Sequence, residues 1–412
     1  MNQTFELEQQ YGANNYSPLP VTLARGKGVW LYDAQDRRYL DMMSAYSAVS
    51  FGHTHPHLVA TLTAQANQLA IVSRAFSHNR LGPFLQKLCQ MTKMDKALPM
   101  NTGAEAVETA IKAARKWGHK VKGIAKDQAE IIVCENNFHG RTTTIVGFSS
   151  HESYRDGFGP FDDGFVRIPF GDIEALHRVI TPHIAAFLVE PVQGEGGMVV
   201  PPPGYLAQAA ALCRQNNVLL IADEVQSGLA RTGKLLACWH DNVQPDGVIL
   251  GKALGGGLLP VSAFAATAEL MAVFTPGDHG STFGGNALAC AVGEEALKLI
   301  ESEQLCQRAE AMGRYLRKKL IDLNAPEITE VRGLGLMCGV VLKPEWNAHV
   351  FCTELLARGI LSKDTHGNVV RLSPPLVINE AEIDIAIAAI EDVLATGRHA
   401  VKERSNLSTH LI

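Results

Sequence analysis

The middle of the chain alternates short, almost entirely apolar runs with segments of helical length. Between about residues 95 and 265 these runs are EIIVCE, AFLVEP, VLLIADE, GVILG and VSAFAAT. Runs that are apolar at every position, rather than at every second position, predict strands of a mostly parallel sheet that helices cover on both faces. In such an α/β sheet, functional residues are expected at the carboxyl ends of the strands.

The two ends of the chain show different patterns. RGKGVWLYDAQDRRYLDMMS alternates apolar and polar residues about a turn, which predicts a small hairpin. After about residue 290, ALKLIESEQLCQRAEAMGRYLRKKL has helical periodicity, and VRGLGLMCGVVL and a helix from about Glu380 follow. The last residues, VKERSNLSTHLI, are polar and expected to be loosely held. We therefore predict a large domain over residues 48–288 and a smaller α+β domain formed by residues 1–47 and 289–412.

Composition limits the class of partner. The chain has 412 residues, of which 46% are apolar, so it can bury a large core. Its net charge of −5 comes without a long basic or acidic block, so we expect small-molecule ligands rather than nucleic acid or a membrane. Eight scattered cysteines without a CxxC pair, a polar N-terminus and no apolar run of membrane-spanning length predict a cytoplasmic protein.

Two of the apolar runs end on charged residues, Asp223 and Lys252. GVILGKA is not a phosphate-binding P-loop, because Ala253 stands where that motif requires Ser or Thr. Burial lowers the pKa of a lysine from about 10.4, which makes its neutral amine available to bond with a carbonyl. A carboxylate such as Asp223 stabilises a protonated pyridine nitrogen. Pyridoxal phosphate needs both partners, whereas helix capping would explain Asp223 and Glu224 alone.

Further segments supply groups that such a cofactor needs. NTGAEAVETAIKAARKWG has Thr102 and Glu105 in capping-box spacing, so a helix should begin near Gly103, and its free N–H groups could hold a phosphate. HGSTFGGN adds two hydroxyl groups, Ser281 and Thr282. ENNFHGR places Phe138 after a strand, where its ring could stack on a flat cofactor, and Arg141 where it could hold a carboxylate. Taken singly, Phe138 and Arg141 are better explained as a core phenylalanine and a surface arginine, and any capped helix would show the spacing of Thr102 and Glu105.

Together these motifs carry a resemblance. NTGAEA, NNFHGR, EPVQGE, DEVQSG, GKALGGG and HGSTFGGN, in this order, resemble the class III aminotransferases, which have the fold-type I architecture and use pyridoxal 5'-phosphate. The resemblance implies that Lys252 bonds to the cofactor aldehyde and that Asp223 pairs with its ring nitrogen. It also implies cofactor contacts from Phe138, Gln226, Gly103, Ala104, Ser281 and Thr282. Because Thr282 would come from the neighbouring subunit, the resemblance implies a homodimer.

The flanking segments bear on the substrate. QYGANNYSPLPVTLARGKG, SAYSAVSFGHTHP and VRLSPPLVI resemble the ornithine aminotransferase branch of the family. This resemblance implies that Tyr16 and Tyr46 line the pocket and that Arg141 holds the α-carboxylate of L-ornithine. It also implies that Glu195 bridges Arg371 while ornithine binds, and releases it for 2-oxoglutarate. The expected products are glutamate and glutamate 5-semialdehyde, which cyclises to 1-pyrroline-5-carboxylate.

Three alternatives stay open at this point. The core motifs also suit relatives that act on N-acetylornithine or other ω-amino acids. GHTHPH presents His53, His55 and His57 at alternate positions, which a metal-dependent hydrolase could use together with Asp223, although Pro56 suggests a turn there. A catalytically silent binding protein with the same fold is the third alternative.

Overall fold

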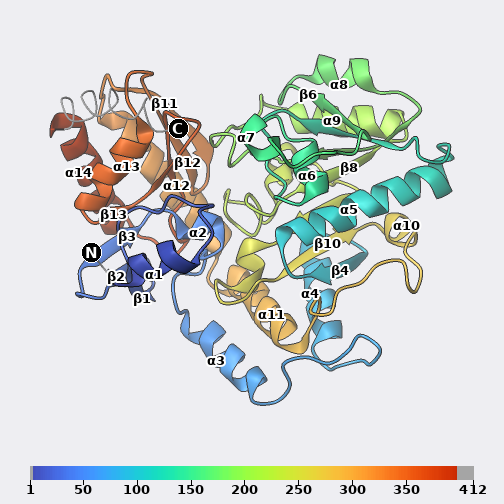
Figure 1. Ribbon diagram of the computed structural model, residues 1–412, viewed down its shortest axis with the longest axis horizontal. Helices are drawn as coiled ribbons and strands as arrows, with labels where there is room; N and C mark the ends of the chain where they lie inside the picture. The colour runs from blue at the N-terminus through green and yellow to red at the C-terminus, as the bar shows by residue number, and fades with distance from the viewer. Residues whose placement is uncertain (1–2, 397–412) are drawn as a thin grey trace.

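The computed structural model describes residues 3–396. Figure 1 shows the middle of the chain on one side of the molecule and the two ends of the chain together on the other. The predicted polar tail VKERSNLSTHLI lies outside the described residues.

The central feature is a seven-stranded sheet in the order β4-β10-β9-β8-β7-β5-β6. Five of its strands match the five apolar runs of the sequence, and β5 to β9 pair in parallel, so the mostly parallel sheet is confirmed. Only β10 departs from this direction, because it is antiparallel to both β4 and β9. The strands are β4 (Lys96–Met100), β5 (Glu130–Cys134), β6 (Phe165–Ile168), β7 (Ile184–Val189), β8 (Leu219–Asp223), β9 (Gly247–Leu250) and β10 (Ser262–Ala266).

Helices cover both faces of this sheet, which explains why its strands are apolar at every position. In β8, Leu219 and Ile221 face the helix α5 (Gly103–Trp117), whereas Leu220 belongs to the core on the opposite face, with α8 (Ile173–Val179) and α9 (Tyr205–Gln215). Because successive side chains of a strand point to opposite faces, both sets must be apolar. The sheet is therefore buried between two helical layers.

The two ends of the chain form two smaller sheets. The predicted hairpin is the antiparallel arrangement of β1 (Leu23–Lys27), β2 (Trp30–Asp33) and β3 (Arg38–Asp41). From the other end of the chain, β13 (Ile360–Leu361) pairs in parallel with β3. The second sheet has the order β11-β12-β15-β14 and is antiparallel. Its strands are β11 (Ile328–Leu334), β12 (Met337–Leu342), β14 (Lys363–Thr365) and β15 (Val369–Leu372).

The helical stretch after residue 290 consists of two helices, because Gln304 adopts a left-handed backbone conformation with φ of 51° between them. The first, α11 (Ala287–Ser302), packs against α3 (Pro56–Ala66) and α4 (Leu81–Thr92). Pro56, which the sequence suggested for a turn, is instead the first residue of α3, where its missing N–H costs nothing. The other helices are α1 (Gln3–Tyr11), α6 (Thr143–Gly147), α7 (Glu152–Arg155), α10 (Ala268–Met271), α12 (Leu305–Asp322), α13 (Ala348–Ala357) and α14 (Glu380–Thr396).

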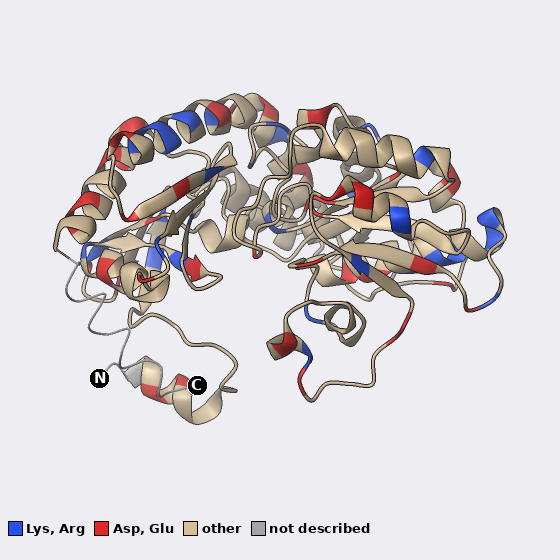
Figure 2. Ribbon diagram, turned by 90° about the horizontal axis from the view of Figure 1, so that it is seen from above, with Lys and Arg blue, Asp and Glu red and all other residues tan. Residues whose placement is uncertain are grey.

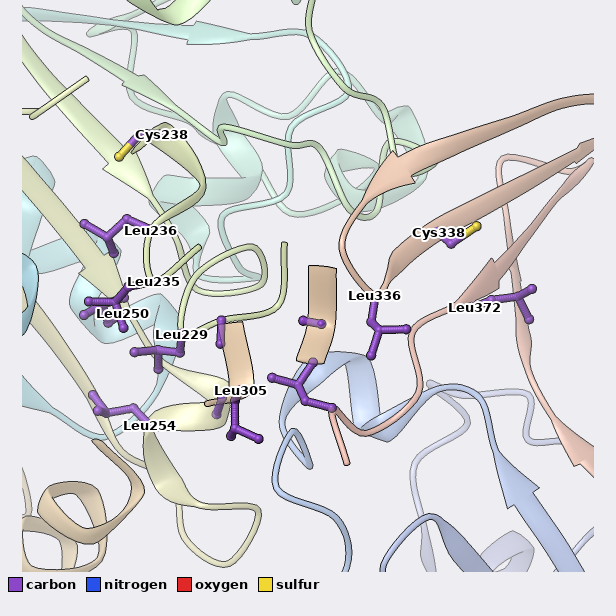
Figure 3. Close-up of a cluster of buried hydrophobic side chains, with 14 of the residues drawn as sticks. Leu229, Leu235, Leu236, Cys238, Leu250, Leu254, Leu305, Leu336, Cys338 and Leu372 are labelled. Carbon is purple, nitrogen blue, oxygen red and sulfur yellow. The ribbon is translucent and has the colours of Figure 1, made fainter. Parts of the chain in front are cut away.

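One apolar core joins the middle of the chain to its C-terminal part. Figure 3 shows Leu229 and Leu250 from the middle of the chain in the same buried cluster as Leu305, Leu336 and Leu372. In Figure 2, Lys and Arg positions and Asp and Glu positions are interspersed along the helices. Within residues 3–396, no helix is both long and apolar enough to cross a bilayer. The domain boundaries at residues 47/48 and 288/289 stay a prediction.

Candidate active site

A cavity of about 180 Å³ lies at the carboxyl ends of β7, β8 and β9. This is the edge at which a parallel sheet is expected to bind ligands. Most of the residues proposed from the sequence meet here, and the structure adds several neighbours. The lining residues are Gly103, Ala104, Phe138, His139, Gly140, Glu190, Val192, Glu195, Asp223, Val225, Gln226, Ser227 and Lys252.

Lys252 follows β9 and starts a short 3₁₀ turn (Lys252–Gly255). Its backbone has φ of 44°, an uncommon value for a residue with a side chain, and such strain often marks a functional site. Burial lowers the pKa of the Lys252 amine, while the carboxylates of Glu195, Asp223 and Glu190 act in the opposite direction. The amine therefore loses its proton more readily than a surface lysine, as a nucleophilic lysine requires.

Asp223 ends β8 and is paired inside the protein with His139. The two side chains are 2.6 Å apart (Oδ2 to Nδ1), and the second carboxylate oxygen accepts the N–H of Val225 at 3.1 Å. Burial alone would lower the pKa of His139, but the hydrogen bond and charge of Asp223 outweigh burial, and the pKa is raised. Asp223 thus lines the cavity with each of its two oxygens held by a hydrogen bond.

Glu190 is a third buried ionisable group of this site. It follows β7, and its Oε2 accepts the N–H of Phe138 at 3.0 Å. Burial raises the pKa of Glu190 to about 7; the nearby His139 lowers it and Asp223 raises it further. No role for Glu190 or His139 was predicted from the sequence. Their signal was available, because both are polar residues of the motifs EPVQGE and NNFHGR, just beyond strand ends.

The start of α5 lines the cavity next to the segment that carries Lys252, since a Cβ at Gly251 would lie 3.6 Å from the Cα of Gly103. The predicted capping box is confirmed, since Thr102 Oγ1 accepts the N–H of Glu105 and Glu105 Oε2 accepts the N–H of Thr102. The first N–H groups of an α-helix have no acceptor within the helix, so those of Gly103 and Ala104 can serve an anion. Gly140 must lack a side chain, because a Cβ there would lie 2.9 Å from the Cβ of Ala104.

Gln226 extends its side chain beneath Gly194, into space that only a glycine leaves free. A Cβ at Gly194 would fall 1.3 Å from Gln226 Oε1. Gln226 Nε2 donates to the carbonyl of Tyr46 at a long 3.5 Å. The set of one amine, one carboxylate, one amide, an aromatic ring and a helix start is the donor set that pyridoxal phosphate needs, so the residues of this cavity fit that cofactor.

Glu195 and Arg371 form the ion pair that the resemblance implied. Arg371 Nη1 is 2.5 Å from Glu195 Oε1, and Arg371, on β15, is 3% exposed. The guanidinium also lies over the ring of Tyr46, with Cζ 4.8 Å from the ring centroid. A buried, paired guanidinium is hidden from an incoming carboxylate until the pair opens.

Tyr46 lies in a segment with an unusual backbone conformation. Ser44, Ala45, Tyr46 and Ser47 (α2, Ser44–Ser47) have φ values of 43°, 46°, 58° and 77°, so this segment is a left-handed turn built without glycine. Such a conformation costs roughly 1–2 kcal/mol per residue. The sequence SAYS gives no sign of it, and the turn must therefore be held by its surroundings.

Six proposed residues are not among those that line the cavity in this single chain: Tyr46 and Arg371, described above, and four others. Tyr16 is 80% exposed, and Thr282 is exposed as well. Ser281 Oγ accepts from Asn101 at 3.0 Å, beside the start of α5. The Arg141 Cζ lies 3.7 Å from the centroid of Tyr154 and 5.6 Å from that of Phe138. The roles of all the proposed site residues stay predictions.

The histidines of GHTHPH have other partners. His53 pairs with Asp41 at 2.7 Å and His55 with Glu303 at 2.9 Å. Among residues 3–396, no group of three or more His, Cys, Asp or Glu side chains is arranged to hold a metal ion. The described part of the chain thus offers the metal-dependent hydrolase no ligand cluster.

Comparisons with known proteins agree with this geometry. Residues 11–394 match the sequence profile of the family described as aminotransferase class-III. The ornithine aminotransferase of Geobacillus sp. (strain WCH70) is 54% identical over 398 residues, which are 96% of this chain and 100% of that protein. The solved ornithine aminotransferase of Toxoplasma gondii, with partial occupancy of PLP at its active site, has a TM-score of 0.93 and 44% identity over 97% of this chain and 95% of that one. The acetylornithine aminotransferase of Elizabethkingia anophelis has a TM-score of 0.87 and 48% identity over 95% and 98%.

Proposed function

Because the chain belongs to the class-III aminotransferase family, we propose that it is an enzyme that transfers the δ-amino group of L-ornithine to 2-oxoglutarate. The observation that carries the proposal is the ion pair of the buried Arg371 with the partly exposed Glu195, beside Lys252, since it provides one site for two differently shaped substrates. Relatives more than 50% identical over nearly the whole chain are ornithine aminotransferases.

The enzyme depends on pyridoxal 5'-phosphate. When bound, the cofactor supplies an aldehyde for amine exchange and a ring that accepts electrons. In the proposed arrangement, Lys252 bonds to it and Asp223 faces its ring nitrogen. The start of α5 at Gly103 and Ala104 would hold its phosphate, Phe138 would cover its ring, and Gln226 would bond to its 3-oxygen.

Lys252 and Asp223 have different proposed roles in the reaction, proton transfer and charge stabilisation. Because burial lowers the pKa of Lys252, its Nζ releases a proton more readily than a surface lysine and can then take one up from the reacting carbon. The carboxylate of Asp223 would stabilise positive charge on the ring nitrogen of the cofactor, and its hydrogen bond with His139 Nδ1 keeps it oriented. Together the two residues hold a proton donor and a charge stabiliser at fixed places.

Ornithine must present its far amine to Lys252. We infer that Arg141 holds the α-carboxylate and that Tyr16 and Tyr46 border the α-amino end. While Glu195 pairs with Arg371, the second guanidinium cannot attract this carboxylate to the wrong place. The δ-amine is then the amine that reaches the reacting centre.

2-Oxoglutarate needs the opposite arrangement, because its α-keto carbon must react. Opening the Glu195–Arg371 pair would expose the guanidinium to the α-carboxylate, which two parallel hydrogen bonds can hold. Arg141 would then hold the distal carboxylate. The same pocket thereby accepts a diamine by its far end and a keto acid by its near end.

Parallel assays with L-ornithine, N-acetylornithine and 4-aminobutyrate, each with 2-oxoglutarate, test the substrate. We expect the highest kcat/KM with L-ornithine, together with a trappable cyclic imine, because the semialdehyde product can close on its own α-amine. N-acetylornithine has a blocked α-amine and cannot give this ring. Faster turnover of N-acetylornithine would transfer the assignment to that substrate, for which the similarity to the Elizabethkingia enzyme provides the precedent.

The assembly and location of the enzyme are also part of the proposal. We infer a homodimer in which Thr282, with its neighbour Ser281, contacts the cofactor phosphate of the partner subunit. Thr282 is exposed in the single chain, as a residue that serves another subunit would be. The scattered cysteines support a reducing compartment such as the cytoplasm.

A further inference from the structure

Arg231 is a completely buried arginine that makes no ion pair in the described structure. Its Nη1 donates to the carbonyls of Leu336 at 3.0 Å and Pro374 at 2.6 Å, and its Nη2 donates to the hydroxyls of Ser44 at 3.2 Å and Ser50 at 3.0 Å. Burial lowers the pKa of the guanidinium to about 9. Removing a guanidinium from water costs free energy, and the four hydrogen bonds to its acceptors offset part of that cost.

Those acceptors enclose the left-handed turn that carries Tyr46. Ser44, its first residue, also donates through Oγ to the carbonyl of Ser373 at 2.6 Å, and its N–H donates to Asp41 Oδ1 at 2.8 Å. Arg231 donates to Ser44, the first residue of the turn, and to Ser50, whose Oγ in turn donates to the carbonyl of Ser47, the last residue of the turn, at 3.0 Å. The planar guanidinium reaches several acceptors at once, which a single ammonium group cannot do in the same geometry.

Tyr46, within this left-handed turn, contacts two of the proposed site residues, Arg371 and Gln226. The ring of Tyr46 lies under the guanidinium of Arg371, and its carbonyl accepts from Gln226. Ser373, which Ser44 binds, is two residues beyond Arg371 on the same chain segment. The position of Arg371 is thus connected to Arg231 by direct contacts at each step.

We propose that Arg231 is a positioning residue for substrate choice: it holds the left-handed turn so that Tyr46 keeps Arg371 closed on Glu195. This inference rests on the proposed function, because it concerns the same pair. If the turn loses Arg231, its backbone is released from a conformation that non-glycine residues disfavour. Tyr46 then leaves the guanidinium, the cation–π attraction is lost, and Arg371 becomes available to the α-carboxylate of an α-amino donor.

The first test measures the ratio of kcat/KM for L-ornithine to that for L-glutamate as amino donors. In Arg231→Lys we expect this ratio to fall by about tenfold, in the range that one buried cation–π contact provides. Glu195→Ala, which exposes Arg371 directly, is the positive reference. Arg308→Lys is the matched control, since Arg308 also donates to carbonyls of the C-terminal segment, at Leu376, Val377 and Ile378. The control should keep the wild-type ratio.

Substitutions at Ala45 test the turn while leaving Arg231 in place. Ala45 is exposed, so its variants should fold. Ala45→Val should lower the donor ratio, because a β-branched residue strongly disfavours φ of 46°. Ala45→Gly, introduced into Arg231→Lys, should restore part of the ratio, because glycine adopts this conformation at no steric cost. A merely structural role of Arg231 would not give this rescue.

Phenylglyoxal labelling with peptide mapping provides a readout independent of turnover. We expect Arg371 to be protected in the wild type and labelled several times faster in Arg231→Lys and Ala45→Val. The inference would be overturned if, in both folded variants, Arg371 were labelled as slowly as in the wild type and the donor ratio were unchanged. If the wild type itself does not prefer ornithine, the proposed function fails instead, and the labelling still decides whether Arg231 holds the turn.

Discussion

At the scale of single residues, the site depends on charges that burial and partners have shifted. Lys252 becomes easier to deprotonate, whereas Glu190 becomes easier to protonate. Lys252 and Asp223 could be found from the sequence because each follows an apolar run. Glu190 and His139 also lie just beyond strand ends, but their particular roles could not be predicted from that position, because those roles depend on contacts between different strands.

Replacing Asp223 with Asn tests the carboxylate. We expect the cofactor to remain bound and kcat to fall by at least two orders of magnitude, about 2.7 kcal/mol, because the amide no longer stabilises positive charge across from Lys252. Asp246→Asn is the control: Asp246 accepts the N–H of Leu220 at 2.8 Å and lies just before β9, at the other end of the sheet. Equal kcat in both variants would remove Asp223 from the mechanism.

The raised pKa of Glu190 leads to a prediction of how the free energy of unfolding depends on pH. Its pKa is raised to about 7 in the folded protein, so the folded state holds a proton that the unfolded state releases at lower pH. The corresponding stability is complete at low pH and is lost as pH rises through about 7. In Glu190→Gln the acceptor for Phe138 remains but the titration disappears.

Urea unfolding of the wild type and Glu190→Gln at pH 5 and pH 8 measures this effect. The variant should gain stability relative to the wild type as pH rises, by up to about 3 kcal/mol. His139 and Asp223 face Glu190, so the same comparison in a His139→Gln background shows how much of the change depends on them. Parallel pH profiles for wild type and variant would contradict the raised pKa.

At the scale of elements, features that depend on neighbouring residues were predicted from the sequence, whereas features that depend on distant contacts were not. The five apolar runs became β5 and β7 to β10, and the capping box of α5 was confirmed, because both depend on nearby residues. The left-handed turn of α2 has no local signal, since Arg231 and Ser373 hold it from distant parts of the chain. The direction of β10 was equally hidden, because a continuous apolar run does not distinguish a parallel from an antiparallel neighbour.

The capping box yields a prediction at this scale. Thr102→Ala should lower stability by about 1 kcal/mol and also weaken cofactor binding, because the cap orients the N–H groups at the start of α5. Asn347→Ala is the matched control, since Asn347 caps α13 through the N–H groups of His349 and Val350, away from the cavity. Thermal unfolding and cofactor titration of both variants check this. Equal cofactor affinity in both would argue against a phosphate at α5.

At the scale of the whole molecule, the proposed dimer determines activity. Since Thr282 is assigned to the partner's cofactor site, dilution should separate the subunits and release cofactor in parallel. Sedimentation velocity and cofactor absorbance over the same concentration series measure the two processes. Thr282→Ala should stay dimeric and bind the cofactor more weakly. An active monomer would refute the shared site.

The whole account rests on which nitrogen of ornithine is transferred. The most direct measurement is incubation with 2-oxoglutarate and L-ornithine carrying ¹⁵N at either the δ- or the α-position, followed by mass spectrometry of both products. We predict that δ-¹⁵N appears in glutamate and that α-¹⁵N stays in 1-pyrroline-5-carboxylate. Transfer of α-¹⁵N to glutamate would contradict the proposal that Glu195 and Arg371 direct the far amine to Lys252.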